Sequence, residues 1–201
     1  TPTPEEHPEQ RLLTIMFCDL VGSTELAQRV DPEELRSIVK TYYGLCDDAI
    51  ARFGGHVVKH IGDGAMAYFG YPIASDDDAV SAVQAGLAIC SGTRQLTTMS
   101  TSTADLNVRV GINTGPAIVG LDGSGSTREA LSVGDAINVA ARIEGASPSG
   151  RVTISEATRR MVEVRFELDS LGATHLKGVA QAVPLFAVNA PTSAAARDVG
   201  R

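Results

Sequence analysis

A run of apolar residues near the start of the chain leads into a carboxylate and a glycine-containing turn. Leu12 to Phe17 has the composition of a buried central strand, and Asp19 follows where that strand is expected to end. The Gly22-Ser23-Thr24 turn comes next, and it opens a helix whose free N–H groups could bind phosphate. Ser23 or Thr24 could instead simply cap this helix. The sequence predicts a carboxylate beside a phosphate-binding turn.

A second carboxylate is expected at the tip of a hairpin. Residues His56 to Phe69 are typical of two short strands that turn at Asp63-Gly64. An Asp-Gly pair taken alone usually marks only a turn. If this hairpin lies beside the first strand, however, Asp19 and Asp63 meet. Paired carboxylates can hold Mg²⁺ or Mn²⁺ on the phosphates of a nucleotide.

A third motif lies far downstream, on a helix expected to start at Gly134-Asp135. Asn138 and Arg142 are four residues apart, so both side chains lie on one side of that helix. Arg142 could form an ordinary surface ion pair with Asp135 or Glu144. The alternative is an arginine that binds phosphate, for which the planar guanidinium is well suited.

Together these motifs resemble the catalytic domain of the class III adenylyl and guanylyl cyclases, most like the bacterial adenylyl cyclases, over about Leu12 to Val188. The resemblance implies that Asp19 and Asp63, helped by the backbone carbonyl of Leu20, bind two divalent ions, Mg²⁺ or Mn²⁺. It also implies that Gly22, Ser23 and Thr24 hold the triphosphate.

The same resemblance assigns roles to four more residues. It implies that Asn138 orients the ribose and that Arg142 stabilises the phosphoryl group being transferred. Arg109 and Lys177 match positions that bind the triphosphate. Without the resemblance, Arg109 is an ordinary strand residue facing solvent and Lys177 is a lysine in a turn.

The positions that contact the base match the family only in part. Lys59 stands where adenylyl cyclases carry a lysine that accepts adenine, which favours ATP. Its partner position, usually Asp or Thr, is Leu131. Leucine cannot accept a hydrogen bond from the adenine amino group. We therefore expect ATP to be preferred over GTP by a modest margin.

The resemblance also implies an assembly: a homodimer in which each active site takes residues from both chains. The expected activity is conversion of ATP to 3′,5′-cyclic AMP and pyrophosphate. A guanylyl or mixed-specificity cyclase is one alternative, and a catalytically silent regulatory module of the same fold is another. An unrelated nucleotide-binding protein is disfavoured, because the chain lacks a Gly-x-x-x-x-Gly-Lys-Ser/Thr phosphate loop.

The expected fold is α+β, a ferredoxin-like core with an antiparallel-rich sheet and helices packed on it. Two long helices are predicted at Glu33–Phe53 and Asp76–Leu96, the second beginning with three aspartates. Residues Val108–Asn113 and Ala117–Leu121 are predicted as two strands separated by Thr114-Gly115-Pro116. Further strands are expected at Phe166–Leu171 and Val183–Val188.

Composition agrees with one compact domain. The chain has 201 residues, 43% of them hydrophobic, and a net charge of −7 that argues against nucleic-acid binding. We expect a flexible segment at 1–10, the cyclase domain at 11–188 and a disordered tail at 189–201. No apolar stretch is long enough to span a membrane and no signal peptide is evident, so a cytoplasmic location with three reduced, buried cysteines is expected.

Overall fold

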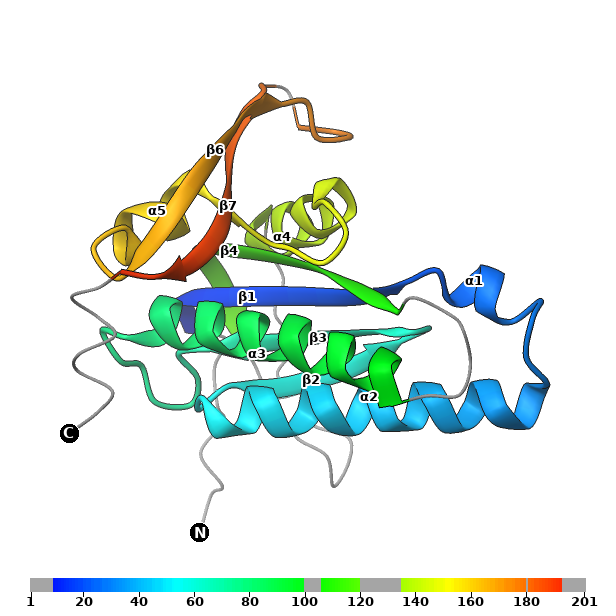
Figure 1. Ribbon diagram of the computed structural model, residues 1–201. Helices are drawn as coiled ribbons and strands as arrows, with labels where there is room; N and C mark the ends of the chain where they lie inside the picture. Colours follow the sequence, from blue (N-terminus) through cyan, green and yellow to red (C-terminus); the bar gives the residue numbers. More distant parts are fainter. Residues whose placement is uncertain (1–8, 100–105, 120–134, 180, 193–201) are drawn as a thin grey trace, which may run out of the picture.

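The computed structural model describes residues 9–99, 106–119, 135–179 and 181–192. Its centre is a seven-stranded sheet with the strand order β2-β3-β1-β4-β5-β7-β6 (Figure 1). Neighbouring strands are antiparallel except β4 and β5, which are parallel. Helices pack on both faces of this sheet, so the fold is α+β with a mostly antiparallel sheet, as the sequence predicted.

The middle of the sheet is β1 (Glu9–Val21), which lies between β3 (Gly64–Phe69) and β4 (Asn107–Val119). The buried apolar run of β1 explains this position, because a central strand is covered on both faces. β1 begins inside the segment expected to be flexible, since Glu9 pairs with Val119 of β4. At the other end of the domain, the last strand continues to Pro191.

The prediction of two strands around Thr114-Gly115-Pro116 is wrong, because β4 is one continuous strand. Leu13 pairs with Gly115 and Leu12 pairs with Pro116, so β1 keeps its register through the turn-like sequence. On its other side, β4 pairs with β5 (Val152–Ser155) only at residues 110–112. Pro116 therefore lies beyond β5, at a sheet edge where a proline without an N–H group is tolerated.

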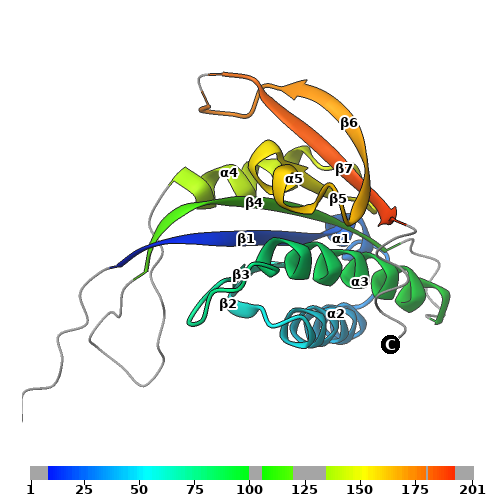
Figure 2. The ribbon, with the colours of Figure 1, turned by 90° about the vertical axis from the view of Figure 1, so that its left-hand side faces the viewer.

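Three helices form the layers that cover the two faces of the sheet. α2 (Pro32–Arg52) and α3 (Asp78–Met99) lie on one face, and α4 (Asp135–Ala146) lies on the other (Figure 2). Side chains of β1 point alternately into the two hydrophobic cores, one on each face of the sheet. Met16 belongs to the core under α2 and α3, whereas Leu13 and Ile15 pack with Ala140 of α4.

The ends of α2 lie within one residue of their predicted positions, whereas α3 begins two residues later and ends three residues later than predicted. The Asp31 carboxylate accepts hydrogen bonds from two backbone N–H groups in the first turn of α2, those of Glu33 and Glu34. Gly54, with φ of 76°, follows the end of α2. The three aspartates lead into α3, where Asp78 accepts a hydrogen bond from the Ser75 N–H group.

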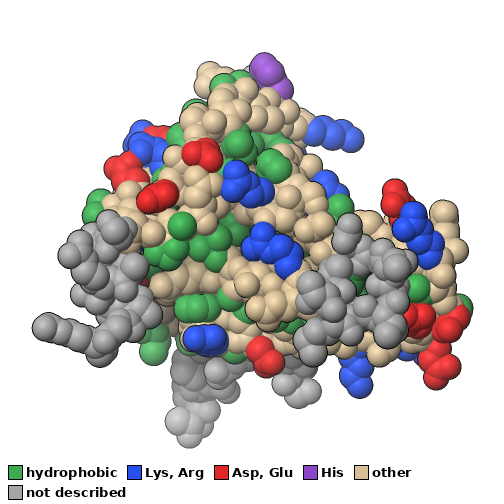
Figure 3. Space-filling model, in the orientation of Figure 1, with side chains coloured by type: hydrophobic (Ala, Val, Ile, Leu, Met, Phe, Trp, Pro, Cys, Tyr) green, Lys and Arg blue, Asp and Glu red, His purple; other side chains and the backbone are tan. Residues whose placement is uncertain are grey.

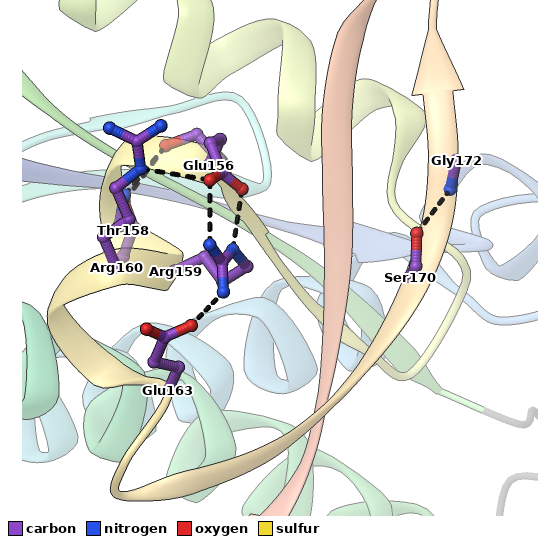
Figure 4. Close-up of polar contacts among 8 residues, drawn as sticks. Glu156, Thr158, Arg159, Arg160, Glu163, Ser170 and Gly172 are labelled. Atoms are coloured by element: carbon purple, nitrogen blue, oxygen red, sulfur yellow. Dashed lines mark hydrogen bonds and ion pairs between the residues drawn. The ribbon is translucent and has the colours of Figure 1, made fainter.

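The last part of the domain is a ribbon of β6 (Phe166–Thr174) and β7 (Val183–Pro191), which rises away from the central strands (Figure 1). α5 (Glu156–Val162) packs beside it. Figure 4 shows Arg159 of α5 between Glu156 and Glu163, with ion pairs to both. The Arg159 guanidinium also lies 5.3 Å from the Phe186 ring centroid, so it ties α5 to β7.

Acidic side chains gather at the end of the molecule formed by α1 (Ser23–Leu26) and the start of α2 (Figure 3). Cys18, Cys46 and Cys90 are buried and free, which confirms the prediction of reduced thiols. In the part of the chain that the structure describes, no helix combines the length and the apolar character that crossing a membrane requires.

Candidate active site

Asp19 lies near the end of β1, where the two neighbouring strands bring it beside Gly64 and Arg109. The glycine is required by close packing. A Cβ atom at position 64 would lie 2.7 Å from the Cys18 carbonyl oxygen and 3.0 Å from Asp19 Oδ1. The absence of that side chain lets the half-buried Asp19 carboxylate lie directly over the start of β3.

The hairpin that carries Asp63 forms as predicted, but its turn lies one residue earlier. β2 (His56–Ile61) ends where Ile61 pairs with Gly64, so Gly62 and Asp63 form the turn. Gly62 has φ of 63°, a value suited to the first position of a two-residue hairpin turn. Gly64 belongs to the strand instead, because it must pass under Asp19.

The two aspartates meet, as the sequence predicted. Burial and the nearby charge of Asp63 together raise the pKa of the Asp19 carboxyl to about 6, although Arg109 partly offsets them. Carboxylates that repel each other in this way suit a divalent cation, which would offset both charges. Among the described residues, no three His, Cys, Asp or Glu side chains form a metal-binding group. Further oxygen ligands would therefore come from the backbone or a bound phosphate.

The turn after β1 does not use a side chain to cap α1. Gly22 is the N-cap residue, with φ of 84° and no side-chain hydrogen bond to the helix. The Ser23 hydroxyl donates instead to Asp63 Oδ2. The alternative that Ser23 caps the helix is thus not what the structure contains, and Ser23 connects the turn to the second carboxylate. The Leu20 side chain is buried in the core, while Thr24 is exposed.

Glu144 of α4 joins this cluster, which the sequence analysis did not foresee. Its Oε1 atom lies 3.9 Å from Nε of Arg109, a buried atom without a hydrogen-bond partner in the structure. Burial, followed by the charge of Asp19, raises the pKa of the Glu144 carboxyl to about 7. Sequence spacing suggested Glu144 only as a partner of Arg142. The arrangement depends on α4 crossing β4, which spacing along one helix does not reveal.

Arg142 has a different neighbour from those considered on sequence grounds. Its guanidinium lies against the turn that contains Lys177 and Gly178, and a Cβ atom at Gly178 would lie 3.1 Å from Arg142 Nη2. Asn138 is exposed on the same helix. The structure therefore brings Arg142 and the Lys177 turn together, separately from the group formed by Asp19 and Asp63.

Lys59 is exposed on β2, next to an irregularity in the hairpin. Val57 pairs with Ala67 and Lys59 pairs with Met66, so the register shifts by one residue at Val58. Such a bulge changes the direction of the side chains that follow it. Leu131, the other residue expected to reach the base, lies outside the described residues.

Comparison with known proteins gives a consistent assignment. Residues 5–190 match the family described as the adenylate and guanylate cyclase catalytic domain. Adenylate cyclase of Anabaena cylindrica is 34% identical over 67% of this chain and 27% of that protein. Guanylate cyclase 32E of Drosophila melanogaster is 30% identical over 83% of this chain and 14% of that protein.

A solved structure shows the same fold. The crystal structure of the adenylyl cyclase CyaB from P. aeruginosa superposes with a TM-score of 0.86 at 30% identity, covering 92% of this chain and 96% of that one. The chain spans less than a third of the length of the two curated relatives named above. The match nevertheless covers nearly all of the present sequence, and the chain therefore belongs to the adenylate and guanylate cyclase catalytic domain family.

Proposed function

We propose that this domain is an adenylyl cyclase that converts ATP to 3′,5′-cyclic AMP and pyrophosphate. The observation that carries the proposal is the meeting of Asp19 and Asp63 beside the Gly22-Ser23-Thr24 turn, with the Asp19 pKa raised to about 6. This is a carboxylate pair suited to divalent cations next to a turn suited to phosphate. Family membership supports the same reaction class.

The reaction is an intramolecular phosphoryl transfer. The ribose 3′ oxygen forms a bond to the α-phosphorus, the bond from that phosphorus to the bridging oxygen breaks, and pyrophosphate leaves. The 3′-OH proton is lost in the process. Positioning and charge stabilisation supply most of the catalysis in such a reaction. Two divalent ions held by Asp19 and Asp63 would supply acidification of the 3′-OH and charge compensation at the phosphates.

The side chains of this chain would bind and orient the substrate. Arg109 lies beside Asp19 and is suited to the β- and γ-phosphates. The Arg142 guanidinium lies against the turn that carries Lys177, so these two residues would bring two positive charges to the triphosphate. The exposed amide of Asn138 would orient the ribose. The Glu144 carboxylate keeps Arg109 directed toward α4 until a phosphate competes for it.

A homodimer with shared sites is part of the proposal. Asp19 and the neighbouring Asp63 turn lie near the end of β1, whereas the guanidinium of Arg142 on α4 lies against the connection between β6 and β7. Two copies placed head to tail would join the aspartates of one copy to Lys59, Asn138 and Arg142 of the other. Each dimer would then contain two equivalent sites.

Lys59 supports ATP as the preferred substrate, and Leu131 limits how strict that preference is. Relatives named both adenylate and guanylate cyclase match the chain, so a mixed-specificity enzyme is the second candidate. Loss of one discriminating hydrogen bond is worth ~1–3 kcal/mol, which weakens a preference without reversing it.

We expect Leu131→Asp to increase the ratio of kcat/KM for ATP over GTP. An unchanged ratio would show that position 131 does not reach the base.

The direct test is to incubate the protein with equimolar ATP and GTP and with Mn²⁺ or Mg²⁺, and to identify the products by mass spectrometry. We expect cyclic AMP in excess over cyclic GMP, and neither product with a chelator or with folded Asp19→Asn. A cyclic GMP excess would reverse the substrate assignment. Absence of both products from a folded dimer would favour a catalytically silent module.

A further inference from the structure

The turn that carries Asp63 lies at an exposed position in the sheet. β2 is an edge strand of the sheet, and the Gly62-Asp63 turn ends its hairpin. Ile61 and Gly62 are both exposed, and Asp63 is only half-buried. A side chain that binds a metal ion must nevertheless be held within about 0.5 Å of its working position. Something outside the hairpin has to hold this turn.

Two hydroxyl groups from helices hold it. The Ser23 hydroxyl of α1 donates to the Asp63 carboxylate. The Tyr43 hydroxyl of α2 donates to the backbone carbonyl of Gly62. The first bond acts on the carboxylate, and the second fixes the backbone of the residue immediately before it. α2 is 21 residues long and packs on the core, so it provides a rigid support.

The Tyr43 ring is itself fixed by its neighbours. It stacks against the His60 ring of β2, with 4.2 Å between the ring centroids and an interplanar angle of 41°. His60 Nε2 lies 3.2 Å from Oδ1 of Asp47, a residue one helical turn after Tyr43 on α2. Tyr43 and Asp47 of α2 therefore both contact His60 of β2, and the Tyr43 hydroxyl reaches from this contact to the turn.

We propose that Tyr43 is a positioning residue for the metal ligand Asp63. Its hydroxyl holds the Gly62-Asp63 turn so that the Asp63 carboxylate faces Asp19 in the free protein, before any ion binds. The role rests on the proposed function, because it assumes that Asp63 binds a metal ion. It differs from the roles above in that Tyr43 acts through the backbone and does not contact the substrate.

The test compares Tyr43→Phe with Tyr71→Phe as a matched control. Both changes remove one hydroxyl from a half-buried tyrosine and keep the ring, but Tyr71 packs against the core on the other face of the sheet, which also contains Ala136 and Ala140 of α4. Amide hydrogen exchange is measured in the metal-free protein. We expect exchange at residues 61–64 to accelerate about fivefold in Tyr43→Phe only, the factor that loss of one neutral hydrogen bond produces.

A second measurement follows the metal itself. Free Mn²⁺ is monitored by electron paramagnetic resonance during titration of the protein with Mn²⁺ alone. We expect Tyr43→Phe to bind Mn²⁺ about fivefold more weakly. In the cyclase assay, half-maximal activity should need about fivefold more Mn²⁺, while kcat at saturating Mn²⁺ stays within about twofold of wild type. If Tyr43 only stabilised the fold, Tyr43→Phe would lower the melting temperature without raising the Mn²⁺ requirement at nearly constant kcat.

Three results would overturn the proposal: unchanged exchange at residues 61–64, unchanged Mn²⁺ affinity, or equal effects in Tyr71→Phe. The exchange and Mn²⁺ measurements do not depend on catalysis. If the wild-type protein forms no cyclic nucleotide, the proposed function fails, and these two measurements still decide the role of Tyr43.

Discussion

The carboxyl groups of Asp19, Asp63 and Glu144 lie close enough for their charges to affect one another. Burial is the first cause of the raised pKa at both Asp19 and Glu144, and the neighbouring carboxylates add to it. Arg109 opposes the shift at both residues but does not cancel it. The free protein therefore holds more negative charge in this region than the surroundings stabilise, which is the condition that a bound cation would relieve.

This arrangement predicts a stability that depends on pH. A carboxyl with a raised pKa in the folded state stabilises the fold below its unfolded-state pKa, and the contribution is lost as pH rises through the folded value. For Glu144 that interval runs from 4.5 to about 7. In chelator, the free energy of unfolding should therefore fall between pH 5 and pH 7.5.

The variant Glu144→Gln tests whether the Glu144 charge causes this pH dependence, because glutamine keeps the size of the side chain and removes its charge. Its free energy of unfolding at pH 7.5 should exceed that of wild type by on the order of 1 kcal/mol, after allowance for the solvent that reaches the site, and the two should converge near pH 4.5. Chemical denaturation at several pH values measures the difference. Parallel pH profiles for the two proteins would contradict the account.

At the scale of residues, the sequence predicts the site residues that lie next to a recognisable strand end or turn. It misses the site residues whose partners lie on another helix or strand. Asp19 and Asp63 are found because each lies at the end of a predicted strand. Glu144 and Tyr43 give no such signal, since each meets its partner only through packing. The turn at Gly62-Asp63 is one residue away from the predicted position because Gly64 is needed for its contact with Asp19.

At the scale of elements, α4 connects the two groups of site residues. Arg142 lies at the Lys177 turn, and Glu144, two residues later, lies at Arg109. The helix can approach β4 closely because Gly111 has no side chain: a Cβ atom there would lie 2.1 Å from the Glu144 backbone nitrogen. The position of both charged residues therefore depends on one glycine in the strand below.

We predict that Gly111→Ala destabilises the protein by about 3 kcal/mol, because backbone atoms of α4 cannot move aside without repacking the helix. The matched control is Gly145→Ala on α4, where a Cβ atom would have no neighbour within 4 Å. That change should instead stabilise the helix by up to about 1 kcal/mol. Chemical denaturation of both variants provides the comparison, and equal stabilities would refute the packing argument.

The helices were easier to predict than the long strands. Asp31-Pro32 and Gly54 mark the ends of α2 through local hydrogen bonds and backbone angles, so the sequence nearby is sufficient. β4 is different, because Gly115 and Pro116 favour a turn locally. Pairing with β1 along the full strand outweighs that preference. Tertiary pairing of this kind cannot be read from the segment itself.

At the scale of the whole molecule, one chain carries both groups of the proposed site, but at different places. The aspartates lie near the end of the central strand, and Arg142 lies at the turn of the β6–β7 ribbon. Head-to-tail apposition of two chains would complete two sites at once. The central claim is thus that each active site takes its metal ligands from one chain and its phosphate-stabilising arginine from the other.

Complementation between two inactive variants tests this claim most directly. Asp63→Ala and Arg142→Ala should each form less cyclic nucleotide than wild type by at least two orders of magnitude, since each removes a group that stabilises the transition state. In a mixed dimer, one site contains both substitutions and the other site contains neither. With random exchange of equal amounts, half the dimers are mixed, so about a quarter of wild-type activity should return. No recovery, with subunit exchange verified by mass spectrometry, would show that each site is built within one chain.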